Sequence, residues 1–173
     1  DKLGLAPGPE ARELVAPLGG DNGDRIAAAR AEWPRDETFR VLVVEDEEQI
    51  ARLILRSLRQ AGLECYHAAD GQAALEVLPQ AQPHLILLDI AMPRMDGLTA
   101  CEEIRKSSDI PIIIATAQRE SEAQLRAFAL GADDYILKPF RPKLLVARVQ
   151  ANLRRVYQYH PVAVTAKIAM KRR

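Results

Sequence analysis

Five side chains that could do chemistry stand just after apolar runs of the sequence. They are Glu45, Asp46, Asp89, Thr116 and Lys138. Asp89 ends the apolar run 85–88, where an acid is either functional or the cap of a following helix. Three carboxylates held together would repel one another unless a divalent cation lay among them, and oxygen ligands suit Mg²⁺. With an ammonium group and a hydroxyl beside them, the set would bind phosphoryl oxygens, which suits phosphoryl transfer onto Asp89.

Whether these side chains meet depends on the elements that carry them, and from Arg40 the sequence alternates strand and helix patterns. We expect strands at residues 41–44, 63–67, 84–88, 110–115 and 135–137. We expect helices at residues 47–61, 70–78, 95 or 97 to 106, 121–130 and from 142 onward. Pro79 and Pro83 are expected to end the second helix. The last helix presents an apolar stripe of Leu145, Val149, Leu153 and Val156.

This alternation predicts an α/β fold with a doubly wound parallel sheet of five strands, because strands joined by helices cannot pair as hairpins. The carboxyl ends of parallel strands lie at one edge of the sheet, so the five side chains can converge there. Each has a simpler explanation alone. An acid at 45 or 46 can cap a helix, Thr116 can close a turn, and Lys138 can be a solvated surface charge. All five arriving at one edge by chance is improbable.

Composition limits the remaining function classes. Lys plus Arg equals Asp plus Glu, 24 each among 173 residues, so no overall charge attracts nucleic acid or membranes. No apolar run approaches the roughly 20 residues of a membrane span, and no signal peptide precedes the regular pattern. Cys65 and Cys101 lie in apolar patterns without metal-site spacing, which favours buried reduced thiols in a cytoplasmic protein.

The chain divides by composition into three parts. Residues 1–39 are rich in glycine and proline and are predicted to be an N-terminal extension or linker, partly helical. Residues 40–157 form the regular domain. Residues 158–173 carry only basic charges and are predicted to be a C-terminal linker or tail, since a few charges on such an end are more often solvated than bound to DNA.

Four motifs match a known family. They are VLVVEDE at 41–47, LILLDIAMPRMDG at 85–97, IIIATA at 112–117 and GADDYILKPF at 131–140. Through them, residues 40–157 resemble the receiver domain of a two-component response regulator, most closely the subfamily with a winged-helix output domain. The resemblance implies a flavodoxin-like (βα)5 fold with strand order 2-1-3-4-5. It also implies a cytoplasmic signalling switch that is not an enzyme, apart from catalysing its own phosphorylation and dephosphorylation. Such a switch would act on DNA only through an output domain that is not in this chain.

The resemblance also implies roles for the site residues. Asp89 would accept a phosphoryl group from a histidine kinase. Mg²⁺ would be held by Asp46, Asp89 and the backbone carbonyl of Ala91, with Glu45 helping through water. Lys138 would pair with the acyl phosphate, while Thr116 and Tyr135 would form the switch. The kinase would dock on the first helix and on the loop after the fifth strand, through Ile50, Leu53 and Phe140.

Members of this subfamily dimerise through the fourth helix, the fifth strand and the fifth helix of the domain. Asp134 and Arg148 match one ion pair of that interface. Leu144 and Gln150 stand where an acidic and a basic residue are usual. We therefore expect a variant homodimer, able to form without phosphate and held by Leu144, Ala151 and their neighbours.

Other protein classes fit less well. A haloacid dehalogenase phosphatase also uses an aspartyl nucleophile with Mg²⁺, but it needs a second acid where this chain has Ala91. A P-loop or Rossmann protein would carry a glycine-rich motif after the first strand, where this chain has EDEEQ. A degenerate receiver that acts as a constitutive dimerisation or interaction module remains the alternative, although every phosphorylation residue is present.

Overall fold

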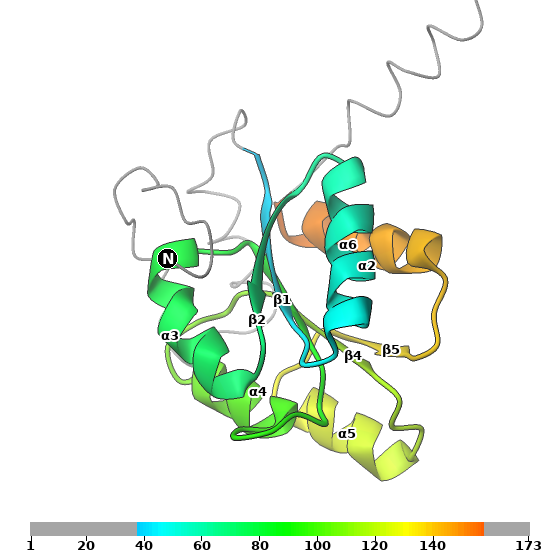
Figure 1. Cartoon of the computed structure of the whole chain (residues 1–173). Helices are drawn as coiled ribbons and strands as arrows, with labels where there is room; N and C mark the ends of the chain where they lie inside the picture. The colour runs from blue at the N-terminus through cyan, green and yellow to red at the C-terminus, as the bar shows by residue number, and fades with distance from the viewer. Residues whose placement is uncertain (1–37, 158–173) are drawn as a thin grey trace, which may run out of the picture.

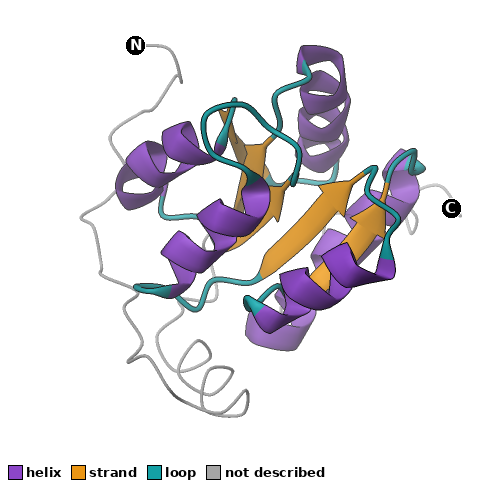
Figure 2. Cartoon of the chain, turned by 90° about the horizontal axis from the view of Figure 1, so that it is seen from below, coloured by secondary structure: helices purple, strands orange, loops and turns teal. Residues whose placement is uncertain are grey.

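Residues 38–157 are described by the structure, a computed structural model, and form a five-stranded sheet between two layers of helices (Figures 1 and 2). The strands are β1 (Arg40–Val44), β2 (Glu64–Ala68), β3 (Leu85–Leu88), β4 (Ile112–Thr116) and β5 (Asp134–Leu137). The helices are α2 (Glu48–Gln60), α3 (Gly71–Ala81), α4 (Gly97–Arg105), α5 (Ser121–Ala129) and α6 (Pro142–Tyr157). The extension and tail predicted at the two ends lie outside the described residues, except for residues 38 and 39.

The strand order is β2-β1-β3-β4-β5, which confirms the expected fold. Val41 on β1 is paired with Cys65 on β2 and with Leu85 on β3. Every neighbouring pair of strands is parallel, so all carboxyl ends lie at one edge of the sheet. The order changes direction between β1 and β3, which is where sheets of this kind open a ligand crevice.

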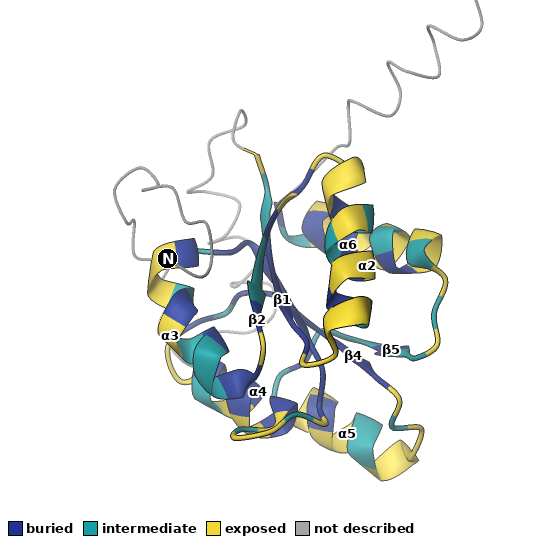
Figure 3. Cartoon of the chain, in the orientation of Figure 1, coloured by how far each residue is buried: buried dark blue, intermediate teal, exposed yellow. Residues whose placement is uncertain are grey.

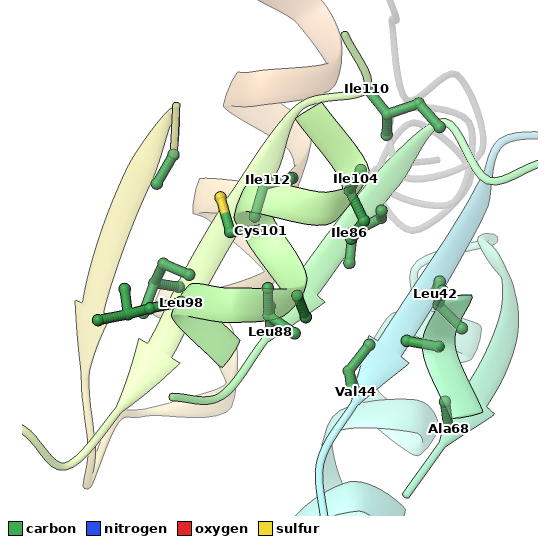
Figure 4. Close-up of a cluster of buried hydrophobic side chains, with 14 of the residues drawn as sticks. Leu42, Val44, Ala68, Ile86, Leu88, Leu98, Cys101, Ile104, Ile110 and Ile112 are labelled. Atoms are coloured by element: carbon green, nitrogen blue, oxygen red, sulfur yellow. The ribbon is translucent and has the colours of Figure 1, made fainter. Parts of the chain in front are cut away.

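Alternate side chains of the strands point to opposite faces, and each face has its own apolar core. Toward α3, α4 and α5 the inner strands present Leu42, Val44, Ile86, Leu88, Ile112 and Ile114. Toward α2 and α6 they present Val41, Val43, Leu85, Leu87, Ile113 and Ala115. Figure 4 shows Leu98, Cys101 and Ile104 of α4 within the first core. Because the inner strands are buried on both faces (Figure 3), they are continuous apolar runs in the sequence.

The end of α3 differs from the prediction. Asp70 caps this helix as expected, because its Oδ1 accepts a hydrogen bond from Ala73 N at 2.9 Å. The predicted stop at Pro79 is wrong, since the helix continues through Pro79 to Ala81. A proline in the last turn removes only one helical hydrogen bond, so the turn can still form. The helix ends at Gln82, whose φ of 42° is left-handed.

Other boundaries move by a few residues. Of the two predicted starts of α4, Gly97 is the correct one, because Asp96 caps the helix and accepts a hydrogen bond from Thr99 N at 2.8 Å. β4 begins at Ile112 rather than residue 110 and includes Thr116. In α6 the predicted stripe is buried except for the half-buried Val156, and Tyr157 is buried beyond it.

Cys65 and Cys101 are buried free thiols, as predicted. Burial raises the pKa of both, that of Cys65 to about 11, so neither is a reactive thiolate at neutral pH. Within residues 38–157, no helix combines the length and the apolar composition that crossing a membrane requires.

An aromatic cluster lies at the amino-terminal edge of the sheet. The buried ring of His84 packs against Phe39 and Tyr157, at centroid distances of 4.8 and 5.4 Å. Its Nδ1 accepts a hydrogen bond from Arg40 N at 2.7 Å, which an imidazolium nitrogen could not do. Burial, and then the charge of Arg40, lower the pKa of His84 to about 2. His84 is therefore neutral in the folded protein.

We expect this histidine to make the fold less stable in mild acid. Below its ordinary pKa of 6.5 the unfolded chain binds a proton that the folded chain does not, so stabilisation present above pH 6.5 is lost as the pH falls. The loss between pH 7.5 and 5 should be about 2 kcal/mol. Urea denaturation of His84→Asn should show that much less pH dependence than wild type. Equal pH dependence in His84→Asn and wild type would contradict the neutral buried ring.

Candidate functional site

The predicted side chains lie at the carboxyl edge of the sheet. Glu45 follows β1, Asp89 follows β3 and Lys138 follows β5, so three strands supply one side chain each. One carboxylate oxygen from each of Glu45, Asp46 and Asp89 lies within 4.8 Å of the other two. Thr116 ends β4, the strand between β3 and β5, and is buried at the same edge. The convergence expected from the sequence is thus present.

Lys138 joins two of the acids. Its Nζ lies 2.5 Å from Glu45 Oε2 and 3.2 Å from Asp89 Oδ2. Its backbone N–H donates to the carbonyl of Thr116 at 2.9 Å, which extends the β4–β5 pairing to the lysine itself. Burial disfavours the ammonium charge, but the hydrogen bond to Glu45 and the charges of both acids outweigh it and raise the pKa of Lys138. Lys138 is therefore a cation fixed between the two carboxylates.

Lys138 does not fully compensate the buried carboxylates of the site. Glu45 is only 2% exposed, and burial raises its pKa even though Lys138 counteracts part of that effect. Oδ1 of the buried Asp89 has no hydrogen-bond partner within residues 38–157. A buried carboxylate oxygen without a partner is costly, so this atom favours a bound cation. Three carboxylates, with Asp46 exposed to solvent, form the oxygen-rich donor set that Mg²⁺ prefers.

The helix-cap explanation for Asp89 does not hold. The next helix, α4, is capped by Asp96. Between Asp89 and Asp96 the chain forms a loop that closes on itself, because Gly97 N donates to Ile90 O at 2.9 Å. A Cβ built on Gly97 would lie 1.9 Å from the backbone oxygen of Asp89, so only glycine allows this closure. The loop carries Ala91, which is exposed.

Thr116 and Tyr135 are linked through one residue of the loop after β4. Thr116 Oγ1 accepts a hydrogen bond from Gln118 N at 3.4 Å, so the simpler turn role also applies to it. The Tyr135 hydroxyl donates to Gln118 O at 2.7 Å. The half-buried Tyr135 ring lies 6.5 Å from the ring of Phe128 on α5, centroid to centroid. Movement of this loop would therefore reach both side chains.

Some supporting residues were not predicted from the sequence. The His67 side chain lies beside the site, with its Nε2 2.8 Å from the backbone oxygen of Glu45. Arg94 forms an ion pair with Asp70, between the loop after β3 and the start of α3. Neither residue comes directly after an apolar run, which was the pattern used to predict site residues. Their place beside the site could therefore not be predicted from the sequence.

The residues predicted to bind partners lie away from the acids. Arg148 Nη1 on α6 pairs with Asp134 Oδ1 at 2.9 Å within the same chain, so the matching ion pair is intramolecular here. Asp133 pairs with Arg105 and accepts the backbone N–H of Ile112, which leaves it satisfied without a base at residue 150.

Exposure differs among the predicted docking residues. Leu144 is 49% exposed and Leu53 is 45% exposed, so both are available to a partner. Ile50 and Phe140 are half-buried and pack against the core between the sheet and the helices α2 and α6.

Comparison with known proteins gives the family. The model of the response regulator receiver domain matches residues 41–150. The chain belongs to the receiver domain family. The matched residues include the sheet from Val41 onward and most of α6, and Asp89, Lys138 and their neighbours lie among them.

Similar sequences are named as transcriptional regulators. The receiver domain is 46% identical over 116 residues to the probable transcriptional regulator ycf27 of Cyanophora paradoxa, covering 67% of this chain and 48% of that protein. The corresponding protein of Porphyridium aerugineum is 44% identical over 117 residues, covering 68% of this chain and 49% of that protein. The chain thus spans about half the length of these relatives.

Solved structures agree with this assignment. The receiver domain of the Francisella response regulator 1452 is 31% identical with a TM-score of 0.63, and covers 66% of this chain and 95% of that one. The BeF3-activated N-terminal receiver domain of RstA from Klebsiella pneumoniae is 33% identical with a TM-score of 0.64, and covers 66% and 98%. The fold and the family match therefore agree that residues 41–150 are a receiver domain.

Proposed function

We propose that this domain is a phosphorylation-dependent switch in which Asp89 accepts a phosphoryl group from a histidine kinase in the cytoplasm. The observation that carries the proposal is Asp89 itself. One of its carboxylate oxygens is held by Lys138, and the other is buried without a hydrogen-bond partner in residues 38–157. Lys138 therefore orients the carboxylate, while the oxygen without a partner is left incompletely stabilised, and both properties suit a nucleophile.

In the transfer, a carboxylate oxygen of Asp89 forms a bond to phosphorus while the bond from phosphorus to the kinase imidazole breaks. The imidazole, protonated on its other ring nitrogen, leaves with the bonding electron pair as a neutral group, and Asp89 becomes an acyl phosphate. Lys138 supplies a fixed positive charge that can pair with the new phosphoryl oxygens. The Thr116 hydroxyl, at the end of β4, would supply a further hydrogen-bond donor. No proton has to leave Asp89, since it reacts as a carboxylate.

Mg²⁺ fits the acids of this site. Asp46, Asp89 and the carbonyl of Ala91 would hold it, with Glu45 acting through water, and its charge would neutralise phosphoryl oxygens during transfer. The glutamate at position 45 is buried and already paired with Lys138, so it would act mainly by orienting the lysine and metal-bound water.

The conformational change on phosphorylation would be transmitted through the loop after β4. A phosphoryl group on Asp89 would draw the Thr116 hydroxyl toward it and weaken the hydrogen bond to Gln118, which also holds the Tyr135 hydroxyl. Tyr135 would then turn inward, and the α5–β5–α6 face would change. The expected output is transcription, through a DNA-binding domain of the kind that the regulator relatives suggest.

Intact-mass spectrometry tests the phosphorylation. Incubation with Mg²⁺ and acetyl phosphate should add one phosphoryl group to the wild-type chain, and EDTA should prevent it. Asp89→Ala should gain none, while Asp96→Ala, which removes a capping acid outside the cluster, should still be modified. An unmodified wild type would favour the alternative of a constitutive interaction module, and undiminished modification of Asp89→Ala would exclude Asp89 as acceptor.

We also propose a homodimer through the α5–β5–α6 face that does not need phosphate. Apolar side chains support it, since Leu144, Leu125 and Phe128 are all substantially exposed on α5 and α6. Sedimentation at tens of micromolar should give a dimer with or without a phosphate mimic, and Leu144→Asp should dissociate it. A monomer in both conditions would refute this interface. Arg52→Asp on α2 is the matched control, because it introduces an acid on a different face.

A further inference from the structure

An ion pair beside the site ties the loop after β3 to the start of α3. Arg94 lies in this loop and has a φ of 63°, which is uncommon for a residue other than glycine. Its Nε donates to Asp70 Oδ2 at 2.7 Å, and its Nη2 lies 2.6 Å from the same oxygen. A left-handed backbone is unfavourable for a residue that carries a Cβ, so the surrounding contacts must maintain it.

Asp70 is a rigid partner for this arginine. It is buried, and its other oxygen accepts the hydrogen bond from Ala73 N that caps α3. Although burial raises the pKa of Asp70, the bonds from Ala73 and Arg94 together lower it, so the carboxylate is charged at neutral pH. Since both oxygens of Asp70 are engaged, this acid at the end of β2 is not a free metal ligand.

Backbone contacts bring the same two segments together. Gly71 N donates to the carbonyl of Met95 at 3.3 Å. A Cβ on Gly71 would lie 2.8 Å from that carbonyl oxygen, so the loop lies directly against the first turn of α3. The loop is therefore held at Arg94 and Met95 on one side, and by the hydrogen bond between Gly97 and Ile90 on the other. Ala91 lies between these two attachments.

We propose that Arg94 is a positioning residue for the metal site, which through Asp70 fixes the loop that presents the carbonyl of Ala91 to Mg²⁺. This inference rests on the proposed function, in which that carbonyl is a ligand. A carbonyl on a loose loop must be ordered when the ion binds, and partners of metal ligands commonly change affinity 10- to 100-fold. Arg94 touches neither the ion nor the phosphoryl group, so its effect should appear first in binding.

Calorimetric titration of the full chain with Mg²⁺ tests the inference. Arg94→Met should weaken binding about tenfold, and so should Arg94→Gly, which removes the ion pair but relieves the backbone strain. Arg52→Met is the matched control, because that exposed arginine is also ion-paired, with Glu48 on α2, and should bind Mg²⁺ as wild type does. Wild-type affinity in both Arg94 variants would overturn the positioning role. Arg94 is 60% exposed, so its replacement should not prevent folding.

Hydrogen–deuterium exchange on the metal-free protein gives a second measurement that does not depend on the ion. Amides of residues 90–96 should exchange faster in Arg94→Met than in wild type or Arg52→Met, and unchanged exchange would overturn the inference. A wild-type chain that binds no Mg²⁺ would instead overturn the proposed function, and the metal role of Arg94 with it.

Discussion

Replacing Lys138 by methionine is expected to lower the free energy of unfolding by about 3 kcal/mol and to slow phosphorylation of Asp89 about 100-fold. The stability loss arises because Lys138 Nζ is the cation between Glu45 and Asp89, at 2.5 and 3.2 Å. Without it, two buried carboxylates face each other and Glu45 loses the partner that counteracts its burial. The kinetic loss arises because a fixed positive charge is removed from the place where phosphoryl charge develops.

Urea denaturation and the rate of mass increase with acetyl phosphate measure these two effects. Lys143→Met is the matched control, since Lys143 is an exposed lysine on α6, and it should change neither. Lys138→Arg keeps the charge, but the planar guanidinium is larger than an ammonium and should not restore the rate. A Lys138→Met protein as stable and as rapidly modified as Lys143→Met would contradict the role assigned to this lysine.

Replacing Gly97 by alanine is expected to cost roughly 3 kcal/mol of stability and to impair phosphorylation by about 100-fold. The added Cβ would lie 1.9 Å from the backbone oxygen of Asp89, 2.7 Å from its carbonyl carbon and 2.9 Å from Ile90 Cα. All three are backbone atoms, so no side chain can rotate to make room. The loop must move, and Asp89 moves with it.

Gly62→Ala provides the comparison for Gly97→Ala. Gly62 has a φ of 88° after α2, but a Cβ there would meet no atom within 4 Å. Its replacement should cost only about 1 kcal/mol, from the backbone conformation, and should leave phosphorylation unchanged. Thermal denaturation and the phosphorylation rate distinguish the two variants. Equal losses in both would show that the close approach at Gly97 does not hold the acceptor loop in place.

Much of the fold could be predicted from the sequence because its signals are local or topological. Alternating apolar runs and amphipathic stretches specify strands and helices, and short helical connections between strands require a parallel sheet. The wrong predictions concerned single boundaries. Pro79 was expected to end α3, but the helix continues to Ala81 and the chain turns at Gln82, three residues after the proline. A single missing hydrogen bond so close to a helix end is tolerated.

The position of the candidate site could likewise be predicted, because parallel strands bring their carboxyl ends to one edge. Glu45, Asp89 and Lys138 were expected to meet there, and they do. The supporting residues could not be predicted. Asp70 was recognised only as a helix cap, and its second bond, to Arg94, joins residues 24 positions apart whose meeting depends on a loop with a left-handed residue.

The sequence by itself determined the sheet, its two cores and the set of groups at its carboxyl edge, since hydrophobic periodicity and connection length decide these. Only the tertiary structure decided how the groups are paired. It placed the Lys138 ammonium between Glu45 and Asp89, left Asp89 Oδ1 without a partner among the described residues, and paired Asp134 with Arg148 inside one chain. Such pairings depend on how tertiary packing places side chains that are far apart in the sequence, which periodicity does not encode.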